Sequence, residues 1–323
     1  MSFDIGLAIA GLFVGVVVGL TGMGGGALMT PVLVLFFNVP PLTAVSSDLV
    51  ASFFMKPFGA FVHLRRGTVN LKLVGWLCLG SVPSAFAGVF VLRLLGGNSA
   101  SLQDGVKKAL GIALLIAAAG LIAKAYLTLI ERTRATETGE ADPERAPITA
   151  PNITIRPIPT VAIGAIGGLV VGMTSVGSGS LIIIALIALY PLLQANQLVG
   201  TDLVQAVPLV GAAALGHVLY GDFQLGITTS LLVGAIPGTI IGAQLSSRAP
   251  GGIIRRALAL VLVASALKLL GADNTVTVSL IVFVLLASSF GWMLVRRTHG
   301  LPALARTELA EPTAVSPTES QRA

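Results

Sequence analysis

Two glycine-rich stretches stand out in this apolar chain because their residue types could bind a ligand. The first is TGMGGGALMTP at residues 21–31, and the second is TSVGSGSL at residues 174–181. Glycine costs a helix interior about 1 kcal/mol relative to alanine, and proline costs more, so each stretch predicts a helix break. A half-helix that begins after a break directs its first amides and the positive end of its dipole at the break. Two such ends that face each other would favour an anion without a full positive charge.

Further hydrogen-bond donors for this anion can come from the two stretches and from the segments after them. The candidates in the stretches are Thr21, Gly22, Gly24, Gly25, Gly26, Thr174, Ser175, Gly177, Ser178 and Gly179, and those in the later segments are Ser47, Lys56, Thr201 and Gln205. Two simpler interpretations stay open. Glycines also permit close packing of membrane helices, and serine or threonine hydroxyls as often donate to their own backbone.

Ionisable side chains occur inside two apolar segments, where a charge is costly and is usually paired or functional. Asp48, Lys56 and His63 lie on one side of the first segment, and Asp202 and His217 repeat part of this pattern in the second. The Lys56 ammonium could hold an anion as a point charge or neutralise one of the aspartates. Each aspartate could cap a broken helix or carry a coupling proton, and capping is slightly favoured. The histidines lie near segment ends, which favours interfacial hydrogen bonds over a proton relay.

The composition requires a membrane as the solvent. Hydrophobic residues make up 54% and charged residues 11% of the 323 residues, and the mean hydropathy is +0.92, whereas soluble domains carry about 25% charged residues. We therefore predict an all-α bundle of membrane helices. Segments of about 20 apolar residues lie at 41–64, 70–95, 105–127, 197–219, 225–246, 253–271 and 276–296. The segments 5–38 and 158–193 are longer and contain the breaks, so the total is about nine to eleven crossings.

The second half of the chain repeats the first. A shift of 153 residues brings VGLTGMGGGAL at 18–28 onto VGMTSVGSGSL at 171–181, and after a one-residue insertion a shift of 154 holds over the following segments. The matched positions include Asp48 with Asp202, His63 with His217, and Pro83 with Pro237. With five crossings per copy, the two copies are inverted relative to each other. Transporters with inverted repeats bind their substrate near the membrane midplane, where helices are broken.

These features give domain boundaries and an orientation. We predict a first membrane repeat at 1–130, a polar linker at 131–157, a second repeat at 158–271, an additional span at 272–299 and a disordered tail at 300–323. Lys and Arg concentrate in cytoplasmic loops. The clusters Arg65–Arg66, Arg132 with Arg134, Arg255–Arg256 and Arg296–Arg297 place the linker and the C-terminus in the cytoplasm, provided that 158–193 crosses twice. We expect the compartment to be a cell membrane, specifically a bacterial inner membrane.

Several function classes find no support in the sequence. The chain contains no GxxxxGK[ST], HExxH or GxSxG motif, so we expect neither an ATPase nor a hydrolase, and we predict no enzymatic activity, no metal and no cofactor. The single cysteine, Cys78, excludes an intrachain disulfide. The net charge of +6 comes from basic residues beside apolar segments, which indicates a lipid bilayer rather than nucleic acid as partner. A homo-oligomer is compatible with these features.

The stretches GLTGMGGGALMTPVL, AVSSDL and GSVPSAFAG, together with their second-half counterparts, resemble the TauE/SafE (sulfite exporter, TSUP) family of membrane transporters. The resemblance covers residues 5–95 and 158–271. It implies a secondary transporter that exports a small sulfur-containing anion such as sulfite, sulfoacetate or a related sulfonate, with a passive anion channel as the alternative. The chain departs from the family pattern at Ser175, Ser178 and Ser180, which leaves the particular anion open.

Overall fold

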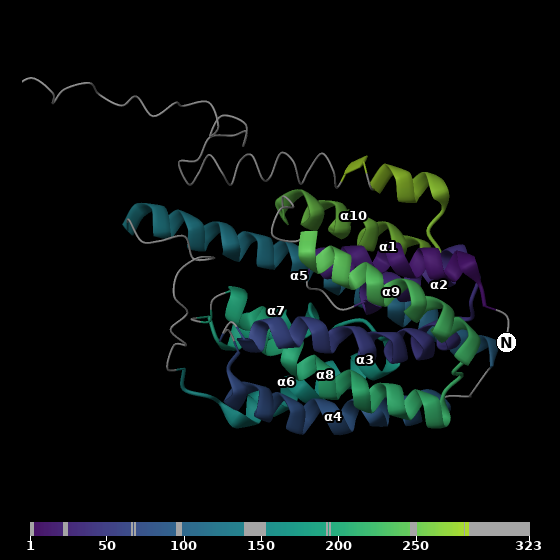
Figure 1. Cartoon of the computed structure of the whole chain (residues 1–323), viewed down its shortest axis with the longest axis horizontal. Coiled ribbons are helices and arrows are strands. Elements are labelled where there is room, and N and C mark those ends of the chain that lie inside the picture. The colour runs from purple at the N-terminus through teal and green to yellow at the C-terminus, as the bar shows by residue number, and fades with distance from the viewer. Residues whose placement is uncertain are drawn as a thin grey trace, which may run out of the picture. The chain divides into compact units, whose positions relative to one another are not determined.

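The computed structural model of the chain describes residues 3–21, 25–65, 67, 69–94, 99–138, 153–191, 193, 195–245, 251–280 and 282–283 (Figure 1). The regular elements of this described part are α-helices, which confirms the predicted all-α class. The helices considered below belong to one compact unit, Met1–Thr277. The rest of the predicted span at 276–296 beyond residue 283 lies outside the described residues, as does the tail at 300–323.

The predicted apolar segments appear as helices, and each long segment appears as two. The bounds are α1 Ile5–Thr21, α2 Gly26–Phe36, α3 Pro41–Arg65, α4 Leu71–Leu94, α5 Ala100–Thr138, α6 Pro157–Thr174, α7 Leu181–Leu189, α8 Ala195–Tyr220, α9 Leu225–Leu245 and α10 Gly251–Leu269. Helix α5 continues beyond residue 130, where we had placed the end of the first repeat. The polar residues after 130 therefore extend a helix before the chain reaches the part of the predicted linker that is not described.

Five of these helices are long and apolar enough to cross a membrane. They are α4, the first part of α5, α6, most of α8 and most of α9. Helix α3 is not among them, although it has 25 residues, because it carries the polar side chains Ser46, Ser47, Asp48, Ser52 and Lys56. These five side chains are buried within the protein, so the other helices cover the polar residues of α3.

The two long apolar segments each fold back on themselves as a helical hairpin. In the first, the Phe37 ring just after α2 lies beside the start of α1, where a Cβ on Gly6 would be 3.3 Å from it. In the second, the Tyr190 hydroxyl just after α7 lies 2.6 Å from the Thr160 hydroxyl and accepts from the Arg156 amide at 2.9 Å, both at the start of α6. Helices α2 and α7 therefore return toward the end of the unit from which their hairpins began.

The two hairpins enter from opposite ends of α3. The Asp4 amide before α1 donates to the Ser230 hydroxyl in the second turn of α9 at 3.1 Å, and the Thr43 hydroxyl at the start of α3 donates to Asp222 just before α9. The starts of α1, α3 and α9 therefore lie together. Helix α4 begins after the other end of α3, and it runs parallel to α6, as described next.

Two parallel helix pairs, α1 with α9 and α4 with α6, are packed backbone against backbone through glycine (Figure 1). A Cβ on Gly11 would lie 2.5 Å from the Leu231 carbonyl oxygen. In the second pair, a Cβ on Gly164 would lie 2.3 Å from the Leu77 carbonyl oxygen. Any other residue at these positions would push the helices apart. For these glycines the packing interpretation is therefore the right one, and only glycines at the breaks remain candidates for a site.

Candidate functional site

The two helix breaks lie against each other in the middle of the unit. A Cβ on Gly26, the first residue of α2, would lie 1.9 Å from the Ser175 carbonyl oxygen and 2.8 Å from the Ser175 hydroxyl. Ser175 is the residue at which α6 ends. The structure thus brings the start of α2 onto the second break at backbone distance. Gly22 and Gly24, which we also named as candidates, lie outside the described residues.

The second break owes its shape to three residues with positive φ. Ser175 has φ 59°, Gly177 has φ 127° and Gly179 has φ 103°, and the latter two angles are ones that residues with a Cβ rarely adopt. The Gly177 carbonyl accepts hydrogen bonds from the Ser180 and Leu181 amides at 3.3 and 3.0 Å. These two amides at the start of α7 already have an acceptor, so they are not available to a ligand as we had expected of the half-helix.

The Asp48 carboxylate on α3 is the hydrogen-bonding centre of the breaks. Its Oδ2 accepts from the Thr30 hydroxyl of α2 at 2.6 Å and from the Ser175 hydroxyl at 2.9 Å, while its Oδ1 accepts from the Ser52 hydroxyl at 3.2 Å. Asp48 is fully buried. One carboxylate therefore joins α3, the first hairpin and the second break. Hydrogen bonds to an ionised acceptor are about twice as strong as neutral ones.

Capping of the broken helices by an aspartate stays a prediction. The Ser180 side chain makes no cap hydrogen bond at the start of α7, and Gly25 before α2 has no side chain that could make one. Asp48 instead receives hydroxyls. The first amides of α2 keep a local acceptor, since the Leu28 and Met29 amides donate to the Gly25 carbonyl at 3.0 and 2.8 Å.

The Lys56 ammonium is held at the second break. Lys56 lies two turns after Asp48 on α3 and is 6% exposed. Its Nζ donates to the Ser178 hydroxyl, and the carboxylates that act on it electrostatically are Asp202 and Asp48. A nearly buried cation beside a glycine-containing loop is thus part of the same cluster as the Asp48 carboxylate.

Two of the candidates on α8 are hydrogen-bonded to α4. Asp202 is 1% exposed. The Gln205 side-chain amide donates to the Ser81 hydroxyl of α4 at 2.6 Å, and the Thr201 hydroxyl accepts from the Asn70 amide at the start of α4 at 3.2 Å. Gln205 and Thr201 are therefore tied to α4.

The Ser47 hydroxyl oxygen and the Gln205 side-chain oxygen are buried and have no hydrogen-bond partner within the described part of the chain. Most buried polar atoms in proteins are hydrogen-bonded, so these two atoms are available to a ligand or to water. Both residues were among the donors that we named from the sequence.

The threonine hydroxyls of the breaks donate to backbone carbonyls of their own helices. Thr21 donates to the Val17 carbonyl at 2.8 Å, and Thr174 donates to the Val170 carbonyl at 2.7 Å. Donation to the backbone of the same helix is the simpler interpretation that the sequence left open for serine and threonine hydroxyls. The hydroxyls that face the Asp48 and Lys56 groups come from Thr30, Ser52, Ser175 and Ser178 instead.

The two histidines that correspond in the sequence differ in their surroundings. His217 on α8 is fully buried, with Nε2 at 2.7 Å from the Gly172 carbonyl oxygen and Nδ1 at 2.7 Å from the Ser46 hydroxyl. His63 is partly exposed near the end of α3. His217 therefore makes its hydrogen bonds within the protein, because α3 and α6 cover this face of α8.

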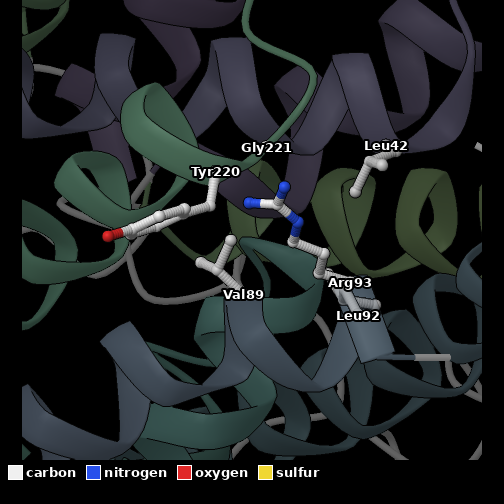
Figure 2. Close-up of a pocket in the computed structure, with 6 residues that line it drawn as sticks. All are labelled: Leu42, Val89, Leu92, Arg93, Tyr220 and Gly221. Carbon is white, nitrogen blue, oxygen red and sulfur yellow. The ribbon is translucent and has the colours of Figure 1, made fainter. Parts of the chain in front are cut away.

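A small cavity of about 30 Å³ lies beside His217 at the end of the unit where α3 begins (Figure 2). It is lined by Leu42, Val89, Leu92, Arg93, Tyr220 and Gly221. Figure 2 shows the Arg93 side chain among the lining residues, and its guanidinium carbon lies 5.7 Å from the centre of the Tyr220 ring.

Sequence reasoning missed Thr30, Ser46, Ser52 and Arg93. Ser52 could have been identified from the sequence, because it follows Asp48 by four residues and so lies one turn away on the same face of the helix. Thr30, Ser46 and Arg93 meet their partners only through the packing of separate helices, and no spacing along the chain indicates those contacts.

Comparison with known proteins identifies the family. The model for the sulfite exporter TauE/SafE family matches residues 7–269, which include the helices from α1 to α10. No solved structure matches the chain.

Curated relatives come from Bacillus subtilis strain 168. The probable membrane transporter protein YjnA is 36% identical over 267 residues, which cover 83% of this chain and 100% of YjnA. The probable membrane transporter protein YunE is 28% identical over 257 residues, covering 77% of this chain and 90% of YunE. The probable membrane transporter protein YdhB is 25% identical over 247 residues, covering 76% and 91%. This chain is a multi-pass membrane protein and belongs to the TauE/SafE sulfite exporter family of membrane transporters.

Proposed function

We propose that this chain is a secondary carrier that exports a small sulfur-containing anion, such as sulfite, sulfoacetate or a related sulfonate, through the space between its two helix breaks. The observation that carries the proposal is the contact of Gly26 with Ser175, which joins the turns of two oppositely entering hairpins. Broken backbone at membrane depth is tolerated where it is buried in protein or lines a cavity.

The side chains at the breaks suit an oxyanion. The Lys56 ammonium is nearly buried and donates to the Ser178 hydroxyl, so a hydroxyl, rather than a close carboxylate, is its hydrogen-bond partner. The Asp48 carboxylate is turned toward three hydroxyl donors. We place the bound anion on the Lys56 side of the cluster, since Asp48 would repel it.

We also propose that the unit consists of two inverted repeats. Contacts within the two glycine-packed pairs support this, because they correspond under the sequence shifts of 153 and 154 residues. Gly11 meets the Leu231 carbonyl as Gly164 meets the Leu77 carbonyl, and Gly234 meets Ala8 as Gly80 meets Val161. The opposite directions of the two hairpins have the same explanation.

The closed contact between the breaks favours a carrier over a permanently open anion channel. A backbone atom of Ser175 and the Cα of Gly26 leave no room for a methyl group between them. An anion can pass only after the hairpins separate, and this step is the alternating access of a carrier.

The orientation that we propose has the linker on the cytoplasmic side. Helix α5 begins beside the start of α3, where the Leu42 amide donates to the Gln103 side-chain oxygen at 3.1 Å. The linker after α5 and Arg65 at the end of α3 then share the other end, in keeping with the positive-inside rule.

Flux measurements on the purified chain in liposomes test the proposal. We expect saturable uptake of radiolabelled sulfite or sulfoacetate, which unlabelled anion competes for, and its loss in Lys56→Met. Lys72→Met is the matched control, since Lys72 is exposed at the start of α4. Failure of every anion in a panel of sulfonates and sulfur oxyanions to move would overturn the proposal, and single-channel currents would replace the carrier by a pore.

A further inference from the structure

His217 completes the end of a broken helix. Helix α6 ends with the Ser175 amide donating to the Val171 carbonyl at 2.7 Å, while the Val176 amide donates to the Thr174 hydroxyl at 3.2 Å. The Gly172 carbonyl therefore does not receive the Val176 amide, which would be its helical partner. The His217 Nε2 lies 2.7 Å from this carbonyl. A carbonyl can only accept, so Nε2 carries a proton and donates it.

The protonation state of the other nitrogen of His217, Nδ1, depends on which acceptor receives the hydroxyl proton of Ser46. The Ser46 oxygen lies 2.7 Å from Nδ1 and 2.9 Å from the Leu42 carbonyl oxygen. A serine has one proton to donate. Donating it to Nδ1 makes the imidazole neutral. Donating it to Leu42 leaves the serine oxygen as an acceptor, and Nδ1 must then be protonated to donate to it.

Both arrangements fit the same heavy-atom positions, so the imidazole can gain a proton without losing a hydrogen bond. The charged form also lies at the C-terminal end of α6, where the helix dipole favours a cation. This end is the second break itself, because Ser175, three residues after Gly172, donates to Asp48 and contacts Gly26.

The cavity of Figure 2 lies next to this pair, and neither member of the pair lines it. Its volume of about 30 Å³ is large enough to hold water. Two of its lining residues contact the pair, since the Leu42 carbonyl accepts from Ser46 and a Cβ on Gly221 would lie 2.8 Å from Nδ1 of His217. A proton can thus arrive from the end of the unit where α1 and α3 begin.

We propose that His217 and Ser46 form the proton-binding site that couples this carrier to a pH gradient, an inference that rests on the proposed transport function. A hydronium ion in the cavity gives its proton to the Ser46 oxygen as the Ser46 proton moves to Nδ1. The new Ser46 hydroxyl then donates to Leu42, and one water remains in the cavity. The imidazole gains one proton and one positive charge at the end of α6.

Charged and titratable groups approach this pair from few directions. Helix α3 contributes Asp48, which accepts a hydrogen bond from Ser175, and α4 contributes Arg93, which lines the cavity. Tyr220 and Asp222 follow on α8 and the loop after it, and α5 carries Asp104, Lys107 and Lys108 in its first turns. The sequences of α6 and α7 contain no ionisable side chain.

His217→Gln separates the proton site from the structural role. A glutamine amide can still donate to the Gly172 carbonyl, but it cannot bind a proton. We expect wild-type protein in liposomes to accumulate sulfite or sulfoacetate about tenfold for a gradient of about one pH unit at one proton per anion. His217→Gln should equilibrate the anion without accumulating it. His63→Gln, at the corresponding position of α3, should accumulate it as the wild type does.

A purely structural role predicts a different result, in which His217→Gln slows flux but reaches the wild-type accumulation. That result would overturn the proposal. Should His217→Gln not fold, Ser46→Ala replaces it, since it removes the relay hydroxyl and leaves the bond to Gly172. Ser46→Thr, which keeps the hydroxyl, should restore accumulation.

A direct titration keeps this proposal distinct from the transport proposal. In nanodiscs, ¹⁵N spectra of labelled histidine should show Nδ1 of His217 changing from acceptor to donor as the sample is acidified, with His217→Gln assigning the signal. An Nδ1 that stays unprotonated until the protein unfolds would contradict the proton site. If the wild type shows no flux but Nδ1 of His217 titrates as described, the transport function is overturned and the proton site stands.

Discussion

Asp48 and Asp202 hold corresponding positions in the two halves of the chain, yet they have different neighbours. Asp48 receives hydroxyls from Thr30, Ser52 and Ser175. Under the sequence shifts, the positions that correspond to these three donors are occupied by Ile183, Ala206 and Gly22, which have no hydroxyl.

The lysine is also confined to one half. Lys56 has Val210 at its corresponding position on α8, and the charge that acts most strongly on Lys56 is Asp202. The comparison teaches that a repeated carboxylate need not have a repeated role. Asp48 is a structural junction between the hairpins, whereas Asp202 balances the charge of a cation that we place at the anion site.

The junction depends first on the absence of a side chain at Gly26. We expect Gly26→Ala to have the largest effect, because its Cβ would lie 1.9 Å from a backbone oxygen of Ser175. Overpacking costs about 1–3 kcal/mol and more where backbone must move, so little folded protein should survive purification. Size-exclusion profiles and thermal unfolding in detergent measure this. Gly75→Ala is the control, since nothing lies within 4 Å of its Cβ position, and equal stability of the two variants would show that the hairpins are not in contact.

Replacing the two carboxylates tests the comparison directly. Asp48→Asn should lower the free energy of unfolding by about 2 kcal/mol, because it weakens charge-assisted hydrogen bonds from three hydroxyls. Asp202→Asn should lower it less. Thermal unfolding of the two variants in the same detergent gives the order. A larger loss for Asp202→Asn would reverse the roles that we assign.

The lysine should matter more for flux than for folding. We expect Lys56→Met to reduce anion flux about tenfold or more, equivalent to about 1.4 kcal/mol, since the anion loses its point charge. The double variant Lys56→Met with Asp202→Asn should be more stable than Lys56→Met alone, because it also removes the buried carboxylate that has lost its cation. Its flux should stay low. Recovery of flux in the double variant would show that Lys56 only neutralises Asp202.

We expect the smallest effect on stability from removing one of the three hydroxyls that donate to Asp48. Ser52→Ala introduces the residue that α8 carries at Ala206. It removes one hydrogen bond of 3.2 Å to Asp48, so we expect a loss of about 1 kcal/mol with flux nearly unchanged. Chemical or thermal unfolding measures the loss. A collapse of stability comparable to Asp48→Asn would mean that the three donors do not act independently.

The helices and their breaks were predictable because lipid leaves a strong composition signal. The segments 41–64 and 225–246 match α3 and α9 closely, and the glycine stretches mark the two breaks. The burial of Asp48 and Lys56 followed from the cost of charge in an apolar segment. These inferences need only properties that lie along the chain.

The distribution of hydrogen bonds could not be predicted in the same way. Thr21 and Thr174 were named as candidates from the sequence and Thr30 was not, although all three are threonines. Only the packing of α2 on α3 places the Thr30 hydroxyl beside Asp48, whereas the other two hydroxyls donate to their own helices. His63 and His217 are sequence counterparts, and their different exposure depends on which helices cover them. Tertiary contacts decide these cases, and a spacing rule cannot.

The glycine-packed pairs connect helices from different halves, since α1 lies on α9 and α4 lies on α6. The halves are consequently interlocked, and each leaves its own glycine-lined grooves unfilled until the other is made. A chain severed between residues 138 and 153 should therefore give two fragments that are insoluble or degraded alone but reassemble when co-synthesised. During biosynthesis the first half must wait in the membrane for its partner, which makes the nascent protein dependent on protection from degradation until the last helices are inserted.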